Sequence, residues 1–203
     1  MTGARFIVLE GGDGCGKSTQ ARLLAAALRR EGLEVVQTFE PGATPLGSAI
    51  RELVLHSRSD VTPLAEALLM AADRAQHVVE QIRPALDRGE WVVCDRYVPS
   101  SLVYQGVVRG LGIDRVRDLN QAALDDAPPD RVVLLDVPDD LAAGRVNRAR
   151  DRLEAEGDEF HRAVREAYRT LARDQGWVIV EGSGTPEAVG ARVWSAIADL
   201  LPG

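Results

Sequence analysis

The sequence predicts an α/β fold, a doubly wound five-stranded parallel sheet flanked by helices. Three observations lead to this prediction. Short apolar runs alternate with helical stretches along the 203 residues, a glycine-rich segment joins the first run to the first helix, and no internal repeat, low-complexity tract or interdomain linker interrupts the pattern. We therefore expect one domain over residues 1–203.

The first strand and helix are the clearest elements. Residues 5–9 (Arg-Phe-Ile-Val-Leu) form an apolar run of strand length, and residues 18–30 carry Leu23, Leu24, Ala27 and Leu28 on one helical face. The remaining strands are predicted at 33–38, 91–94, 131–136 and 177–180. Residues 64–86 predict a long helix that breaks near Pro84, and residues 188–201 predict the last helix.

The long helix over 64–86 is apolar on more than one face, so two sides must be covered. One side can pack on the sheet. The other can pack on a second subunit, although two partners within the chain would serve equally well.

Composition limits the possible functions. The net charge is -7, so general affinity for a nucleic-acid backbone is not expected, and an anion site must be built locally. No apolar run approaches the length of a membrane span, and the N-terminus runs straight into the first strand. Two cysteines are too few for a disulfide scaffold. We expect a cytoplasmic protein that binds neither nucleic acid nor membrane.

The glycine-rich segment from Gly11 to Ser18 matches the phosphate-binding P-loop pattern G-x-x-x-x-G-K-[ST]. Lys17 is the only lysine among 24 basic residues, and its compact ammonium can reach between phosphate oxygens. Glycines let backbone N–H groups and the start of the helix face one anion. Lys17 is therefore expected to bridge the terminal phosphates of a nucleotide, and the Ser18 hydroxyl to bind the accompanying Mg²⁺.

Ligands of parallel α/β sheets bind beyond the carboxyl ends of the strands, so the following loops are the next candidates. After the second strand, a turn from Glu40 leads into a helix that carries Arg51. After the third, Asp95 is placed to hold Mg²⁺ through water, and Arg96 to hold a second anion. A surface ion pair between Asp95 and Arg96 is the simpler alternative.

Residues 145–152 contain four arginines in a chain that is otherwise acidic. They can be a solvated helix face. They can also stabilise the charge on a transferring phosphoryl group. We interpret residues 144–156, approximately, as a short mobile lid whose closure excludes water.

Cys15 and Cys94 follow neighbouring predicted strands, so a redox clamp over the site is conceivable. Two small unlinked residues, with Cys94 packed as a hydrophobe, are the favoured interpretation.

Several motifs in order resemble those of bacterial thymidylate kinases, from Phe6 to Leu201. They are residues 10–19, Glu40-Pro41-Gly42 with Thr44, residues 72–77, Asp95-Arg96-Tyr97 with Ser100-Ser101, Tyr104-Gln105-Gly106, residues 150–154 and Phe160-His161. Apart from the P-loop, each motif taken alone is weak evidence for the family, but the order and spacing of the motifs together are specific to it.

The resemblance implies transfer of the γ-phosphoryl group of ATP to dTMP in dTTP synthesis, with Mg²⁺, by a homodimer. The implied ATP-binding residues are Gly11, Gly12, Asp13, Gly14, Cys15, Gly16, Lys17, Ser18 and Thr19. The implied dTMP-binding residues are Glu40, Arg51, Met70, Arg74, Arg96, Ser100, Ser101, Tyr104 and Gln105. The implied catalytic residues are Lys17, Asp13, Arg96, Arg148, Arg150 and Arg152, and the metal ligands are Ser18 and Asp95.

Within this set, the resemblance implies that Arg51 and Arg96 bind the phosphate of the acceptor nucleotide. Arg74, Ser101 and Gln105 read the thymine edge, and Tyr104 crowds the sugar where a ribonucleotide carries its 2′-OH. The catalytic arginine would come from the lid, because the P-loop has Gly14 and Cys15 instead.

Two positions depart from the family pattern. Phe39 stands where an arginine usually precedes the Glu-Pro-Gly turn, and Met70 stands where an aromatic residue stacks on thymine. We expect weakened or broadened monophosphate binding. A kinase for another nucleoside monophosphate, and a P-loop switch that binds nucleotide and signals to a partner, remain alternatives.

Overall fold

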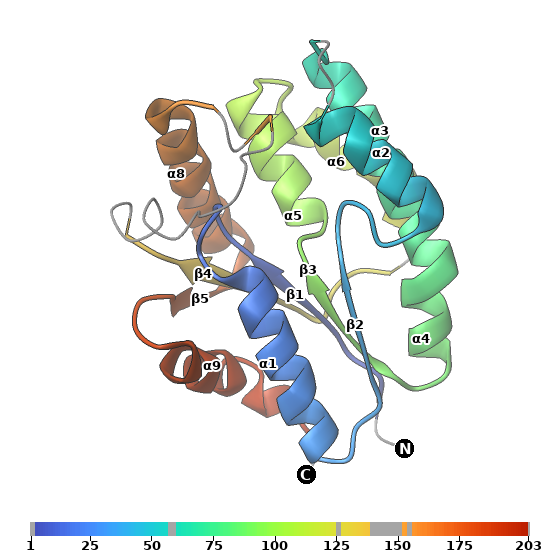
Figure 1. The fold of residues 1–203 in the computed structure, drawn as a ribbon, viewed down its shortest axis with the longest axis vertical. Coiled ribbons are helices and arrows are strands. Elements are labelled where there is room, and N and C mark those ends of the chain that lie inside the picture. The colour runs from blue at the N-terminus through green and yellow to red at the C-terminus, as the bar shows by residue number, and fades with distance from the viewer. Residues whose placement is uncertain (1–2, 57–59, 125–126, 139–151, 154–155, 203) are drawn as a thin grey trace.

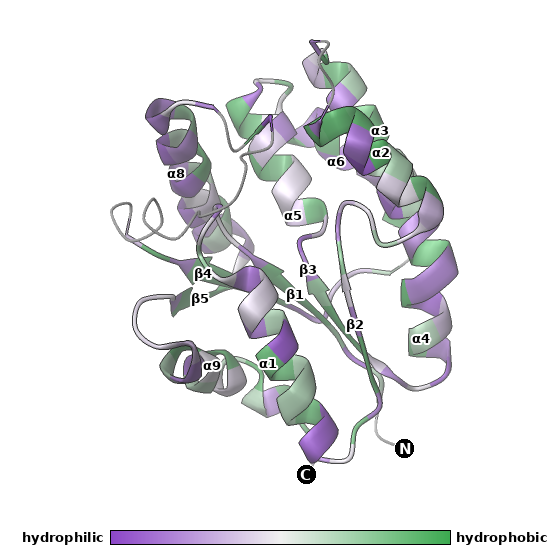
Figure 2. Cartoon of the chain, in the orientation of Figure 1, coloured by the Kyte–Doolittle hydropathy of each residue, from purple (hydrophilic) through white to green (hydrophobic). Residues whose placement is uncertain are grey.

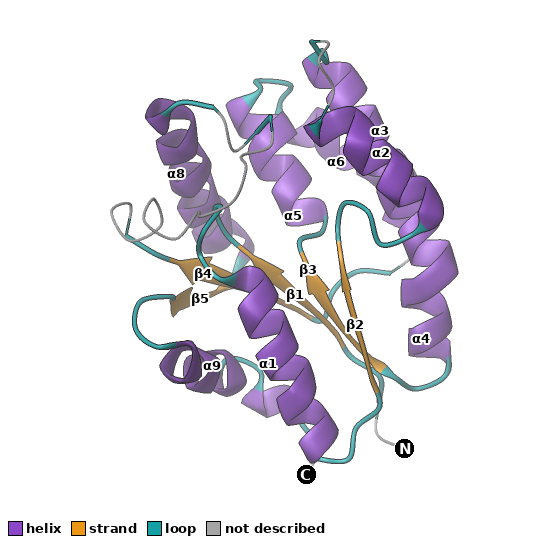
Figure 3. Cartoon of the chain, viewed as in Figure 1, coloured by secondary structure: helices purple, strands orange, loops and turns teal. Residues whose placement is uncertain are grey.

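The computed structural model describes residues 3–56, 60–124, 127–138, 152–153 and 156–202. Its strands form one parallel sheet in the order β2-β3-β1-β4-β5, which confirms the predicted doubly wound α/β fold. Figure 3 shows the strands running between two layers of helices. The strands are β1 (Phe6–Glu10), β2 (Val35–Phe39), β3 (Trp91–Asp95), β4 (Arg131–Asp136) and β5 (Val178–Glu181).

Helices cover both faces of the sheet (Figure 1). The helical segments are α1 (Lys17–Arg30), α2 (Pro45–Leu55), α3 (Pro63–His77), η1 (Val78–Ile82), α4 (Arg83–Asp87), α5 (Val98–Ser101), η2 (Leu102–Val108), α6 (Ile113–Leu124), α8 (Asp158–Gln175), α9 (Pro186–Ser195) and η3 (Ala198–Leu200). Helices α1 and α9 bury their apolar sides against one face. The other face packs against η1 and α4, and helix α8 contacts β4 on the same side.

The strands are apolar because both faces are covered. All five residues of β1 are buried, and Figure 2 shows the strands mostly in the colour of hydrophobic residues. None of the described helices is long and apolar enough to cross a membrane.

The long predicted helix is continuous through Pro84, so the predicted break is wrong. The chain stays helical from α3 through α4, and η1 between them is a π-helical turn in which Arg83 N–H bonds the Val78 carbonyl. Proline has no N–H to donate, so one helical hydrogen bond is missing at Pro84, and the wider turn directly before Pro84 accommodates this missing bond.

Other predicted boundaries differ by a few residues. Strand β2 begins at Val35 rather than Leu33, β3 extends to Asp95, and β5 runs from Val178 to Glu181. The last helix ends at Ser195, and a 3-10 turn follows it. These ends depend on which neighbouring strand or helix pairs with them, which local patterns do not specify.

Candidate functional site

The P-loop connects the buried strand β1 to helix α1. Gly11 and Gly16 have positive φ angles, 143° and 96°, and a Cβ atom on Gly11 would lie 2.6 Å from the Leu135 carbonyl oxygen. Lys17 Nζ donates to the Gly11 and Gly12 carbonyls at 3.0 and 2.9 Å. The ammonium is thus held over the loop, and no side chain of the described residues caps the start of α1. This geometry suits a phosphate group.

Ser18, at the start of α1, and Asp95, at the end of β3, are in contact beside the P-loop. Ser18 Oγ donates to Asp95 Oδ2 at 2.5 Å, and the buried Asp95 Oδ1 has no hydrogen-bond partner among the described residues. No group of three or more His, Cys, Asp or Glu side chains in the described part of the chain could hold a metal ion alone. A hydroxyl and one carboxylate fit Mg²⁺ bound mainly through water and phosphate oxygens.

Arg96 lies inside the site, at the end of β3. It is the one non-glycine residue of the described chain with a positive φ angle, 72°, which is a strained conformation typical of functional positions. Its Nη2 donates to Asp13 Oδ1 at 2.5 Å, and its Nη1 donates to Ser100 Oγ at 3.2 Å and Tyr168 OH at 3.1 Å. The guanidinium therefore faces the P-loop rather than solvent.

Asp13 joins the P-loop to the neighbouring pocket. Tyr104 OH donates to Asp13 Oδ2 at 3.3 Å, opposite the Arg96 contact. Burial alone would raise the pKa of Asp13, but the positive charges of Arg96 and Lys17 outweigh burial and hold this pKa below its usual value. Asp13 is therefore ionised at neutral pH.

Glu10 and Tyr168 support Arg96 and have no role in the sequence-based interpretation. The fully buried Glu10 accepts hydrogen bonds from Tyr97 N–H at 2.8 Å, Ser100 N–H at 3.2 Å, Ser100 Oγ at 2.7 Å and Tyr168 OH at 2.8 Å. Burial raises the pKa of Glu10 despite the opposing charge of Arg96. The available signal was the position of Glu10, which directly follows the predicted strand over residues 5–9 and is the first residue of the motif over residues 10–19.

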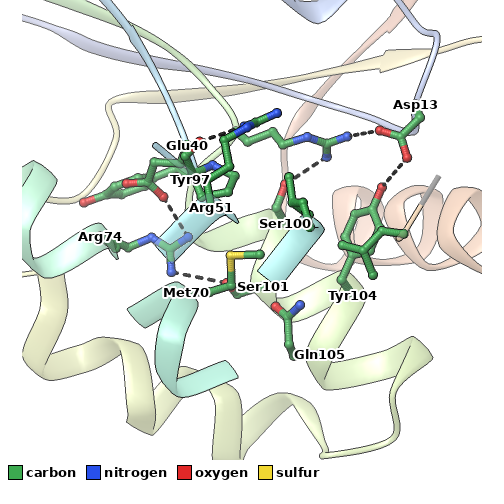
Figure 4. Close-up of a pocket in the computed structure, with 14 residues that line it drawn as sticks. Asp13, Glu40, Arg51, Met70, Arg74, Tyr97, Ser100, Ser101, Tyr104 and Gln105 are labelled. Carbon is green, nitrogen blue, oxygen red and sulfur yellow. Dashed lines mark hydrogen bonds and ion pairs between the residues drawn. The ribbon is translucent and has the colours of Figure 1, made fainter. Parts of the chain in front are cut away.

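A pocket of about 100 Å³ opens beside Asp13 (Figure 4). Its lining residues are Asp13, Glu40, Pro41, Arg51, Leu55, Met70, Arg74, Arg96, Tyr97, Ser100, Ser101, Tyr104, Gln105 and Leu153. All nine residues predicted to bind the monophosphate are among them. Phe39 is not, and its side chain is half exposed.

Arg51 and Arg74 lie at different parts of this pocket. Arg51 Nη1 donates to the Pro41 carbonyl at 2.7 Å. Arg74 is almost fully buried, with Nη2 2.8 Å from Glu40 Oε2 and Nη1 3.2 Å from Ser101 Oγ (Figure 4).

Further residues around Arg74 were not identified from the sequence. Arg74 Nη1 also donates to Asn120 Oδ1, and His77 Nδ1 lies 2.9 Å from Glu40 Oε1. Asn120 occurs in ordinary helical sequence, where no local signal marks it, whereas His77 ends the motif of residues 72–77 but was assigned no role. Their importance follows only from the folded arrangement.

The predicted lid arginines are placed only in part. Arg148 and Arg150 lie outside the described residues. Arg152 donates from Nε to the Val54 carbonyl at 2.8 Å and pairs with Glu66 through Nη2, so its side chain lies against α2 and α3. Its catalytic role stays a prediction.

The two cysteines are free and buried. Cys94 packs with Phe6, Val8 and Val92 in the core, as the favoured interpretation expects. Burial raises the pKa of its thiol, which keeps it protonated.

Comparison with known proteins agrees with this geometry. A family model described as thymidylate kinase matches residues 9–193. A thymidylate kinase of Leifsonia xyli subsp. xyli is 52% identical over 192 residues, covering 93% of this chain and 91% of the relative. One from a Synechococcus strain is 47% identical, covering 97% and 96%, and one from Rhizorhabdus wittichii is 47% identical, covering 98% and 99%. The chain belongs to the thymidylate kinase family.

Proposed function

We propose that the protein transfers the γ-phosphoryl group of ATP to the 5′-phosphate of dTMP, giving ADP and dTDP. The main observation behind this proposal is that the paired side chains of Asp13 and Arg96 lie between the P-loop and a pocket lined by two further arginines, Arg51 and Arg74. Donor and acceptor phosphates held on either side of this pair would be in line for direct transfer.

On the donor side, the P-loop amides and Lys17 bind the ATP phosphates, with Thr19 and the rest of the loop completing the site. Ser18 and Asp95 would hold Mg²⁺, which would neutralise charge on the transferring group. Asp95 Oδ1 supports this assignment, because it is buried without a partner among the residues that the structure describes, and a buried carboxylate oxygen needs a donor or a cation.

On the acceptor side, Arg51 and Arg96 bind the 5′-phosphate, and Arg74, Ser101 and Gln105 read the base. The proposed role of Tyr104, which lines the pocket, is to crowd a ribose 2′-OH. A phosphate acceptor is already anionic, so positioning and charge stabilisation carry most of the reaction and little general-base chemistry is required.

Three residues complete the acceptor site. Glu40 positions Arg74 through their ion pair, and Ser100 positions Arg96. Met70 lies against the face of the thymine ring through its polarizable side chain.

The lid arginines Arg148, Arg150 and Arg152 supply the remaining positive charge at the transferring group. This assignment rests on the family resemblance. The contacts of Arg152 with α2 and α3 favour Arg148 and Arg150 for direct contact, since Arg152 already has buried partners.

The experiment is an ADP-release assay with ATP, Mg²⁺ and a panel of nucleoside monophosphates. We expect release with dTMP and much slower release with the others. Lys17→Ala should abolish turnover with every acceptor, whereas the control Arg22→Ala, an exposed cation on the same helix, should leave turnover unchanged. ADP release that needs no acceptor would instead support a nucleotide-dependent switch.

We also infer a homodimer that forms through α2 and the α3–η1 helix. Leu46, Leu53, Leu68 and Val79 are between 48% and 60% exposed on these helices, although large apolar side chains are usually buried. Light scattering should give twice the chain mass, and Leu68→Glu should lower it. A monomeric unaltered protein would contradict the inference. A cytoplasmic location stays a prediction that follows from the substrates.

A further inference from the structure

The carboxylate of Glu66 is buried next to the acceptor pocket without lining it. Glu66 lies in the first turn of α3, is fully buried, and is absent from the described residues that line the pocket. Gln105 Nε2 donates to its Oε1 at 2.8 Å, Arg109 Nε lies 3.8 Å from the same oxygen, and Arg152 Nη2 pairs with its Oε2. A buried carboxylate needs such partners, and here one of them is the pocket residue Gln105.

This contact sets which end of the Gln105 amide faces the ligand. A carboxylate paired with an arginine only accepts hydrogen bonds, so it holds the NH₂ group of Gln105. The flipped amide would bring two oxygens together in a buried place, which is unfavourable. No donor among the described residues contacts Gln105 Oε1, and Figure 4 shows this oxygen on the side of Met70 and Ser101.

Arg74 and Gln105 then present opposite polarities to a bound base. Arg74 has only donors, and the end of the Gln105 amide that Glu66 does not hold has only an acceptor. This pair is complementary to a pyrimidine that carries a carbonyl oxygen beside a ring N–H, as thymine and uracil do. Cytosine carries an amino group beside an unprotonated ring nitrogen, so both contacts would be mismatched.

We propose that Glu66 is a positioning residue for base selection: by holding the Gln105 amide nitrogen, it makes Gln105 an acceptor and so disfavours cytosine. The inference rests on the proposed function, because it assumes that the base of the acceptor nucleotide lies between Arg74 and Gln105. Glu66 itself need not touch the nucleotide.

The test compares kcat/KM for dTMP, dUMP and dCMP. In Glu66→Gln, the side chain at position 66 can donate or accept, so Gln105 is free to flip. We expect the dTMP:dCMP ratio to fall about tenfold or more. The dTMP:dUMP ratio should stay within about twofold, since these bases share the same polar edge.

Two further variants separate base selection from loss of an ion pair. Arg152→Gln removes the ion pair at Glu66 Oε2 without touching Gln105 and leaves Arg109 beside Oε1, so the dTMP:dCMP ratio should persist even if turnover changes. Gln105→Met leaves Glu66 paired with Arg152 and should itself lower the ratio. Adding Glu66→Gln to Gln105→Met should change the ratio no further. Thermal melts verify that each variant is folded.

A Glu66→Gln protein that loses activity equally with all three acceptors would overturn the inference. So would a Gln105→Met protein with the original ratio, which is informative even if Glu66→Gln does not fold. If the unaltered protein phosphorylates dTMP normally, these outcomes leave the proposed function intact. Absence of turnover with every monophosphate would overturn the proposed function and the inference together.

Discussion

Gly47 in α2 lies where a side chain has no room. A Cβ atom there would be 2.3 Å from Asp73 Oδ1 and 3.0 Å from Thr44 Oγ1. Asp73 would have to move by about 1 Å to restore ordinary contact, which would break its 3.0 Å hydrogen bond from Gly42 N–H. Thr44, which caps α2 by accepting from Gly47 N–H at 2.9 Å, would also shift.

Gly47→Ala is therefore expected to destabilise the protein although alanine is the better helix former. Overpacking costs about 1–3 kcal/mol and a lost hydrogen bond about 0.5–1.5 kcal/mol, offset by about 1 kcal/mol of helix propensity. The free energy of unfolding should fall by about 0.5–3.5 kcal/mol, and at about 2–4 °C per kcal/mol the Tm should fall by roughly 1–14 °C.

Gly190 in α9 provides the matched control. A Cβ atom there would be 3.4 Å from Gln20 Oε1, the end of a flexible side chain, and 3.8 Å from Leu23 Cδ1. Gly190→Ala should therefore raise the Tm by about 2–4 °C through helix propensity alone. Urea unfolding and thermal melts of both variants provide the measurement. A Gly47→Ala protein as stable as Gly190→Ala would refute the argument from space at Gly47.

Three further predictions concern the site. Burial, reinforced by Glu40, raises the pKa of Asp73 to about 6, so the folded state binds more protons than the unfolded state between about pH 4 and 6 and stability is lost as the pH rises through that window. Asp73→Asn should be more stable than the unaltered protein by about 3 kcal/mol at pH 7.5 and by less than about 1 kcal/mol near pH 4, and urea unfolding that shows the same difference at both pH values would contradict this. Asp95→Asn should raise the Mg²⁺ concentration needed for half-maximal turnover about tenfold or more with an unchanged KM for dTMP, and an unchanged Mg²⁺ requirement would remove Asp95 from the metal site. Met70→Phe should lower the KM for dTMP roughly two- to tenfold in steady-state assays, because an aromatic ring stacks on the base more firmly than a thioether, whereas a higher KM would mean that Met70 does not lie on the thymine ring.

The strand order of the sheet is typical of the fold that the sequence predicts, and the P-loop is placed as its pattern indicates. Both depend on local signals, which are alternating apolar runs and a fixed spacing of glycines. The π-helical turn before Pro84 was not predictable, because a proline can either end a helix or be accommodated within it. Which outcome occurs depends on packing against the sheet.

The candidate site was predictable where motifs mark it. The acceptor residues come from α2, α3, α5, η2 and the loops after β2 and β3, and the pocket brings them together. The supporting residues Glu10, Glu66 and Asn120 were not assigned, since their partners are far away in the sequence. Glu66, for example, meets residues 39 and 86 positions later in the chain.

The contacts of Glu10 have a consequence for how this site can change during evolution. Glu10 joins β1 to the backbone at Tyr97, to α5 and to α8, and so assembles the phosphate end before any nucleotide arrives. The base end depends on other acidic groups, Glu40 and Glu66. Substitutions that retune which nucleobase is accepted can therefore accumulate at one end while the reacting groups keep their alignment at the other.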